Sequence, residues 1–273
     1  MKNKYELLVT DIDGTLVNKD GVISDTDLKA LQNIRQKGVM ISLCTGRAAG
    51  GCHKILDKLA MDGFHIFFDG ALVVNSKLNK TIYIRPIEKK LLRQVCDLVQ
   101  SEGITLELFS QTQFYISQQN ALTAVHSQLL DFKPLLSDFS TVISQEDIIL
   151  GCIVITNSEE KQILSLCSGL ESRLRICPTI APSRPDIRMI NITAQGVDKG
   201  TALTALISHL GIKPENVIAI GDGANDVSFL ANSGLAVAMQ NAPDELKDIA
   251  DYVTADAEHS GIAQAINHFF PDE

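Results

Sequence analysis

Two aspartates stand two residues apart, directly after a short apolar run near the start of the chain. Residues 7–9 are Leu-Leu-Val, and Asp11 and Asp13 follow, with Gly14 and Thr15 behind them. Such a run is typical of a buried strand, so both carboxylates are expected at its carboxyl end. Because an unpaired buried carboxylate is costly, the pair indicates a cation, and hard oxygen ligands with room for water and phosphate favour Mg²⁺. The alternative is an ordinary Asp-Gly turn.

A second acidic loop follows a second apolar run far downstream. Residues 217–220 are Val-Ile-Ala-Ile, and residues 221–226 read Gly-Asp-Gly-Ala-Asn-Asp. In parallel α/β sheets, ligands bind beside the carboxyl ends of the strands. A second acidic loop after a second buried strand makes an ordinary turn a weaker explanation of the first.

Two further short sequences have the chemistry to bind an anion. Asp198 is typical of a helix N-cap, which places Lys199 in the first helical turn, where the helix dipole disfavours a cation by roughly 0.3–1 kcal/mol. A phosphate bound at that helix start would compensate, whereas the alternative is a solvated surface lysine. Thr45 and Gly46 follow the predicted strand 39–43 and offer a hydroxyl and an amide to an anion, although Thr-Gly pairs also occur in plain turns.

The composition restricts the classes of partner. A chain of 273 residues is long enough for two domains, and its formal net charge of −9 argues against nucleic acid. Small phosphorylated substrates stay possible, because a metal, a lysine and backbone amides can reverse the field within a cleft. The six cysteines form no CxxC pair and the six histidines no HxxxH pair, which indicates reduced thiols and argues against zinc.

Targeting and membrane signals are missing from the sequence. No signal-peptide core stands at the first residues, and no apolar run approaches the length that crosses a membrane. We therefore expect a cytoplasmic protein without a membrane partner. The composition leaves the oligomeric state open.

Helices and strands alternate at both ends of the chain. Ser24 begins a capping-box-like pattern and Gly38 ends the helix that follows. This alternation predicts an α/β fold with a doubly wound, parallel, Rossmann-like sheet and right-handed crossovers. The remaining predicted elements are helices at 48–60 and 199–210 and strands at 39–43, 64–68, 217–220, 235–238 and 252–253.

The middle of the chain has a different order of elements. From about residue 84 the pattern is αββ-αβ-αββ, which suits an open sheet with helices on one face. We therefore predict an inserted α/β cap domain at 84–191 and a core made of 1–83 and 192–273.

The order of these motifs resembles that of the haloacid dehalogenase-like superfamily, and within it the Cof-type phosphatases with a large α/β cap. The resemblance covers nearly the whole chain. It rests on Asp-Ile-Asp-Gly-Thr-Leu at 11–16, Cys-Thr-Gly-Arg at 44–47, Gly-Val-Asp-Lys-Gly at 196–200, Gly-Asp-Gly-Ala-Asn-Asp at 221–226, Ala-Val-Ala-Met-Gln-Asn-Ala at 236–242 and Ser-Gly-Ile-Ala at 260–263.

The resemblance implies a Mg²⁺-dependent phosphatase that hydrolyses small phosphorylated metabolites, such as sugar phosphates or related cofactors, through an aspartyl-phosphate. Asp11 would be the nucleophile and Asp13 the acid and base. The remaining implied roles are metal binding by Asp11, Asp222 and the backbone carbonyl of Asp13, phosphate binding by Ile12, Thr45, Gly46, Lys199 and Asn225, and orientation of Lys199 or of a metal-bound water by Asp226.

Two positions depart from the family pattern. Asp69-Gly70 stands where members usually carry Asn-Gly, and Asn191 stands where an acidic residue often precedes the lysine by eight positions. Asp69 is either a tolerated turn residue or a change in local polarity at the cap hinge. Two other functions stay open: a phosphomutase, for which Arg173, Arg175, Arg184 and Arg188 would have to hold a second phosphate, and a non-catalytic sensor of a phosphorylated ligand.

Overall fold

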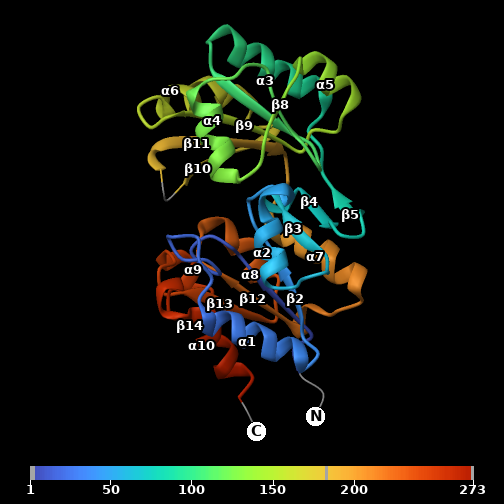
Figure 1. Cartoon of the computed structure of the whole chain (residues 1–273), viewed down its shortest axis with the longest axis vertical. Helices are drawn as coiled ribbons and strands as arrows, with labels where there is room; N and C mark the ends of the chain where they lie inside the picture. Colours follow the sequence, from blue (N-terminus) through green and yellow to red (C-terminus); the bar gives the residue numbers. More distant parts are fainter. Residues whose placement is uncertain (1–3, 182–183, 272–273) are drawn as a thin grey trace. The chain divides into compact units, whose positions relative to one another are not determined.

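The computed structural model describes residues 4–181 and 184–271, which divide into two compact units (Figure 1). The core unit contains the chain up to Gly46, then Lys54–Tyr83 and the residues from Asp198 onward. The insert unit contains Arg47–His53 and Ile84–Val197. The predicted boundary at 191 falls inside a long strand of the insert unit, β11 (Arg184–Ala194). That these units act as catalytic core and specificity cap stays a prediction.

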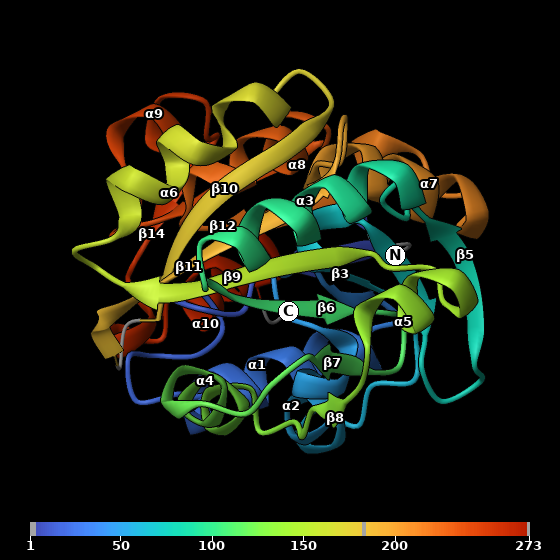
Figure 2. The same ribbon diagram turned by 90° about the horizontal axis from the view of Figure 1, so that it is seen from above.

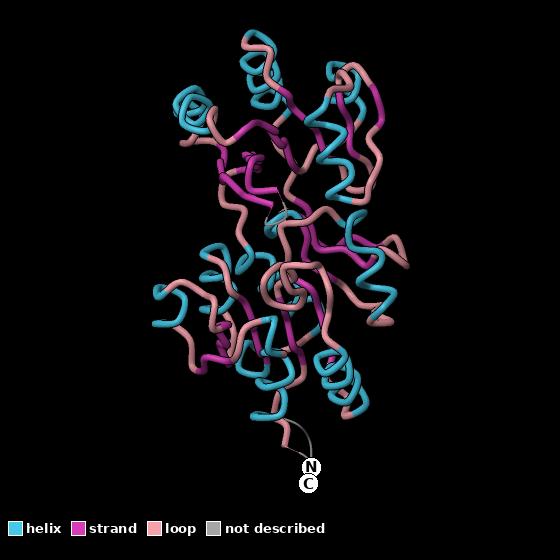
Figure 3. Tube along the Cα trace, turned by 60° about the vertical axis from the view of Figure 1, so that its left-hand side comes forward, coloured by secondary structure: helices cyan, strands magenta, loops and turns pink. Residues whose placement is uncertain are grey.

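A five-stranded parallel sheet forms the centre of the core unit, which confirms the predicted fold class. Its order is β14-β13-β12-β1-β2, and helices surround it in Figure 3. Because β1 pairs with both β2 and β12, the loops that leave β1 and β12 begin side by side at one edge. The strands are β1 (Leu7–Thr10), β2 (Met40–Leu43), β12 (Val217–Gly221), β13 (Leu235–Met239) and β14 (Tyr252–Thr254).

The helices of the core unit begin and end near the predicted caps. The Ser24 side chain accepts a hydrogen bond from the Asp27 amide, and the Asp198 side chain accepts one from the Thr201 amide. Gly211 ends its helix with φ 68°, a conformation that suits glycine. The helices are α1 (Asp25–Gln36), α2 (His53–Lys58), α7 (Lys199–Leu210), α8 (Val227–Ala231), α9 (Asp244–Asp248) and α10 (Gly261–Phe269). The first residue of α2, His53, belongs to the short segment Arg47–His53 of the insert unit. Within the described residues, no helix is both long and apolar enough to cross a membrane.

The third predicted strand, β3 (His65–Phe67), belongs to a separate small sheet. It pairs antiparallel with β4 (Leu72–Asn75), and β5 (Lys80–Ile84) completes the order β3-β4-β5. A parallel bridge between Cys44 and Ile66 links this sheet to the end of β2. The tight turn at Phe68–Gly70 reverses the direction of the chain, so the next strand, β4, runs back along β3. Among the described residues no crossover helix directly follows β3, and β3 therefore does not join the parallel sheet.

The insert unit contains a six-stranded sheet of order β10-β11-β9-β6-β7-β8, which Figure 2 shows with α3 lying over it. Leu106 and Leu108 on one face share an apolar core with residues of α3, α5 and α6. Helix α4 contacts the opposite face through Glu107, so the prediction that all helices lie on one face is wrong for α4. Along the chain, the elements are α3 (Lys89–Ser101), β6 (Thr105–Phe109), β7 (Phe114–Ile116), α4 (Ala121–Leu130), β8 (Leu135–Leu136), α5 (Phe139–Gln145), β9 (Leu150–Thr156), α6 (Glu160–Cys167) and β10 (Leu174–Ala181), followed by β11.

His65 makes the stability of the core unit depend on pH. Its side chain is 1% exposed, its Nδ1 accepts the Leu43 amide at 3.2 Å, and burial lowers its pKa to about 4 from 6.5. The unfolded chain therefore binds more protons between these values, so stability falls as the pH drops from 6.5 to 4, by about 3 kcal/mol.

Urea unfolding across this pH range measures the effect, with His65→Gln as the comparison. Glutamine retains a hydrogen-bond acceptor but does not titrate, so the variant is expected to lose less stability on acidification. Parallel pH dependences for the two proteins would contradict this assignment.

Candidate active site

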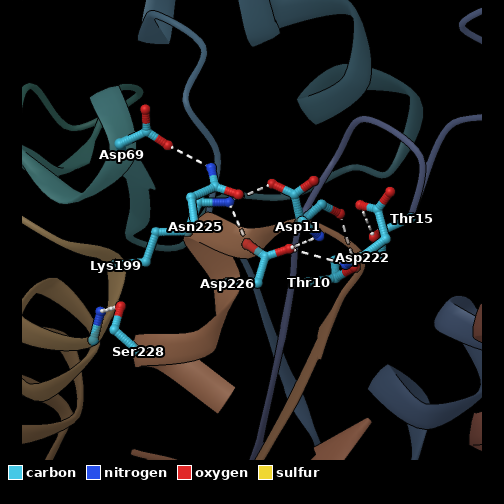
Figure 4. Close-up of polar contacts among 11 residues, drawn as sticks. Thr10, Asp11, Thr15, Asp69, Lys199, Asp222, Asn225, Asp226 and Ser228 are labelled. Carbon is cyan, nitrogen blue, oxygen red and sulfur yellow. Dashed lines mark hydrogen bonds and ion pairs between the residues drawn. The ribbon is translucent and has the colours of Figure 1, made fainter. Parts of the chain in front are cut away.

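The two acidic loops meet at the carboxyl edge of the core sheet, as Figure 4 shows. Thr10 at the end of β1 is in register with Ile220 near the end of β12, and the Asp11 amide donates to the Ile220 carbonyl at 2.9 Å. One ligand atom from each of Asp11, Asp222 and Asp226 lies within 4.8 Å of the other two. This arrangement concentrates three carboxylates in one largely buried place.

Lys199 lies inside this acidic group. Its side chain is 1% exposed, and its Nζ donates to Oδ1 of Asp11 at 2.7 Å and to Oδ1 of Asp226 at 2.6 Å. Burial opposes the charge, but the two carboxylates outweigh it and hold the pKa of Lys199 well above its ordinary value. Lys199 is therefore a buried cation, and the alternative of a solvated surface lysine is wrong.

The ion pair with Lys199 compensates the charge of the Asp11 carboxylate only in part. Burial raises its pKa well above the usual range, and the charges of Asp226 and Asp222 raise it further, while Lys199 lowers it. One lysine faces three carboxylates here, so a bound cation would compensate the excess negative charge. The donor set consists of carboxylate oxygens, which are ligands that Mg²⁺ accepts.

Asp226 uses both of its oxygens in the protein. Oδ1 accepts from Lys199, and Oδ2 accepts from the amides of Asp222 and Gly223, each at 2.9 Å. The side chain is completely buried. These contacts hold the loop after β12 and the lysine in place, as an orienting role would require.

Asp222 is oriented by two neighbours from other loops. Its Oδ1 accepts the Thr15 hydroxyl at 2.9 Å, and its Oδ2 accepts the Asn241 amide at 2.8 Å. Burial is the largest cause that raises its pKa to about 6. A Cβ at Gly14, where φ is +81°, would lie 2.2 Å from Oδ2 of Asp222, so only glycine lets these loops approach. Sequence reasoning gave Thr15 and Asn241 no role, although both stand within the recognised motifs.

Asp69 joins the site from the turn after β3. It is 3% exposed, and its Oδ1 accepts the Asn225 side-chain amide at 2.8 Å. Its backbone amide donates to the Thr45 carbonyl at 3.0 Å, and a Cβ at Gly46 would lie 3.1 Å from its Oδ1. Asp69 therefore packs among three of the predicted phosphate-binding residues instead of standing in a solvent-exposed turn.

Ile12 and Asp13 complete the first loop. The Ile12 side chain is buried, and its carbonyl accepts the amides of Leu16 and Val17 at 2.9 and 2.8 Å. The Asp13 side chain is exposed, unlike that of Asp11, and the three-carboxylate group forms without it. The loop thus turns the two aspartates of the motif toward different surroundings.

Comparison with known proteins extends over nearly the whole chain. The family model of haloacid dehalogenase-like hydrolases matches residues 8–266. A 5-amino-6-(5-phospho-D-ribitylamino)uracil phosphatase of Bacillus subtilis is 31% identical, over 97% of this chain and 95% of its own. A solved haloacid dehalogenase-like hydrolase of Bacteroides thetaiotaomicron superimposes with a TM-score of 0.88 at 26% identity, over 98% of this chain and all of the other. A structure described as a subclass IIB sugar phosphatase gives a TM-score of 0.79 at 26% identity, over 97% of this chain and 98% of the other.

Proposed function

The chain belongs to the haloacid dehalogenase-like hydrolases and is a phosphatase of small phosphorylated metabolites, and on this basis we propose that it works through a phosphorylated Asp11. The observation that carries the proposal is the placement of Asp11 at the end of β1, with its Oδ1 2.7 Å from the buried Lys199 ammonium. A neighbouring cation reduces the repulsion between an anionic carboxylate and an anionic phosphate.

The reaction has two displacements at phosphorus. An Asp11 oxygen attacks the phosphorus, the bond to the substrate oxygen breaks, and Asp13 gives its proton to the leaving alcohol. Asp13 then takes a proton from water, whose oxygen attacks the same phosphorus and releases inorganic phosphate and free Asp11. The exposed position of Asp13 supports this division, because a group that exchanges protons with water and alcohol has to reach both.

The phosphoryl oxygens would be held by groups on neighbouring loops. Lys199, the Ile12 amide, Thr45 and Gly46 supply charge and hydrogen-bond donors. Asn225 donates one amide hydrogen to Asp69, and a primary amide carries two, so one is left for a phosphoryl oxygen.

The cation would be Mg²⁺, held by Asp11, Asp222 and the backbone carbonyl of Asp13. The three-carboxylate group and the excess of negative charge at Asp11 support this ligand set. When bound, the ion neutralises charge that develops on the transferring phosphoryl group. Asp226 would orient Lys199 instead, because its Oδ1 pairs with the Lys199 ammonium and its Oδ2 accepts two backbone amides of its own loop.

The proposed substrate class is a sugar phosphate or a related phosphorylated cofactor. The names of two relatives support this class, since one acts on a phosphorylated ribityl compound and the other is called a sugar phosphatase.

A phosphomutase has less support in the insert unit. A second phosphate would need free arginines, but Arg188 donates to Glu160 at 3.0 Å, Arg184 to Asp186 and Arg173 to Gln94. A sensor without turnover has less support too, because Asp11, Asp13, Lys199 and Asp222 are all present, whereas a degenerate site usually loses one of them.

Hydrolysis of a panel of phosphorylated metabolites tests the proposed function. We expect release of inorganic phosphate from monophosphates with Mg²⁺ and without a bisphosphate activator. EDTA should abolish the activity and added Mg²⁺ should restore it, whereas Asp222→Asn should stay nearly inactive at the same Mg²⁺ concentration. Full turnover in EDTA would contradict the metal assignment, and a requirement for a bisphosphate would favour the mutase.

A further inference from the structure

A second group of potential metal ligands lies inside the insert unit, whereas the three aspartates described above belong to the core unit. One ligand atom from each of Glu107, His126 and Cys152 lies within 4.8 Å of the other two. The three residues are at most 4% exposed. The proposed phosphatase mechanism uses none of them.

Three elements bring these residues together (Figure 2). Glu107 on β6 stands directly opposite Cys152 on β9, so the two side chains share one face of the sheet. Helix α4 lies against this face and adds His126. Asn120 fixes the start of α4: its side chain accepts the Thr123 amide at 2.9 Å and donates to the Thr105 hydroxyl on β6 at 2.8 Å.

The Glu107 carboxylate is only half satisfied by the protein. Its Oε2 lies 2.5 Å from Nδ1 of His126. Its Oε1 is buried and has no hydrogen-bond partner within the described residues. A buried polar atom without a partner destabilises the folded protein, and more so when the group is charged. A Glu–His hydrogen bond by itself therefore does not account for the burial of this carboxylate.

We propose that Glu107, His126 and Cys152 bind a divalent transition-metal ion, and that Zn²⁺ is the ion their chemistry fits best. Carboxylate oxygen, imidazole nitrogen and thiolate sulfur are the three ligand types that zinc accepts, whereas Mg²⁺ and Ca²⁺ disfavour sulfur. A carboxylate, a thiolate and a neutral imidazole together balance the charge of a divalent ion. On binding, the ion replaces the thiol proton of Cys152, which leaves to solvent.

Cys152 offers its sulfur from a buried position on β9, directly opposite Glu107. A coordinating metal deprotonates a thiol outright, so the buried thiol can serve as the sulfur ligand. The sequence contains no local zinc motif at these residues. Strand pairing and helix packing bring them together, so their spacing along the chain could not indicate the site.

Refolding with cobalt tests the proposal. The full-length protein is unfolded in denaturant with a chelator, refolded with one equivalent of Co²⁺ and desalted, so that a buried site is open to the ion during folding. We expect about one retained Co²⁺ per chain, with a thiolate-to-cobalt charge-transfer band in the near ultraviolet. Cobalt bound only at the aspartates of the core unit would lack this band.

Two cysteine variants locate the thiolate. Cys152→Ser should lose the charge-transfer band, whereas Cys167→Ser, which alters another buried thiol of the insert unit, should retain it. Glu107→Gln is a second test that leaves the thiol in place, and it should weaken cobalt retention against a competing chelator by more than about tenfold. Absence of the band in the refolded wild-type protein, or its persistence in Cys152→Ser, would overturn the proposal.

Discussion

Asp11→Asn is expected to abolish phosphate release while leaving the protein folded. Asparagine has nearly the volume of aspartate but does not attack phosphorus, so we expect a loss of about 10⁴–10⁶ in kcat, the range seen when an enzyme loses its nucleophile. The fold should tolerate the change, because burial raises the Asp11 pKa and so already disfavours the charge that the variant removes. Phosphate release at saturating Mg²⁺ and a thermal unfolding curve measure the two effects.

A second aspartate provides the control for Asp11. Asp57 on α2 is exposed, so Asp57→Asn makes the same chemical change without entering the site and should leave turnover and stability unaltered. If Asp11→Asn kept more than roughly a tenth of the wild-type rate, attack by this carboxylate would be the wrong mechanism.

Lys199→Met is expected to reduce both activity and stability. Methionine fills similar space but leaves Asp11 and Asp226 buried without their shared cation. Loss of one partner from a buried ion pair costs about 3–5 kcal/mol, and loss of one oriented charge from a phosphate site costs about 10²–10³ in rate. The measurements are kcat on the best substrate of the panel and the free energy of unfolding in urea.

Lys213→Met is the matched surface control. The Lys213 side chain is 74% exposed and its contact with Glu215 is 3.5 Å, so its removal should change stability by less than about 0.5 kcal/mol. The double variant Lys199→Met/Asp226→Asn should regain part of the lost stability without regaining turnover, since one uncompensated charge is gone. Equal turnover in Lys199→Met and in wild type would remove Lys199 from the phosphate site.

The sequence was sufficient to predict the parallel core sheet and the places of its acidic loops. Apolar runs such as 217–220 are too short and too continuous for surface helices, and the caps Ser24 and Gly211 define where helices start and stop. The burial of Lys199 was harder to foresee. Its place in the first turn of a helix predicted a nearby anion. The contact with Asp226, however, depends on how the loop after β12 folds back on itself.

Other features depend on contacts that periodicity does not encode. Asp69 has the sequence neighbours of a plain turn, and its burial against Asn225 follows from the reversal of the chain after β3. The face of the sheet against which α4 packs could not be predicted either. Glu107 has the sequence pattern of a solvent-facing position on a half-exposed strand, but in the fold it is buried against His126.

The position of β1 between β2 and β12 also determines when the protein becomes active during its synthesis. β1 and β2 are made early, but the other neighbour of β1 begins at Val217, after the insert unit. At about 5–20 residues per second, translation from the end of β2 to the end of β12 takes roughly 10–40 s. For most of that interval the edge of β1 that pairs with β12 has no partner, and neither Lys199 nor Asp222 has been synthesised to join Asp11. The insert unit is complete before β12 exists, so a chain that ends between them contains the whole insert unit but lacks both β12 and Asp222.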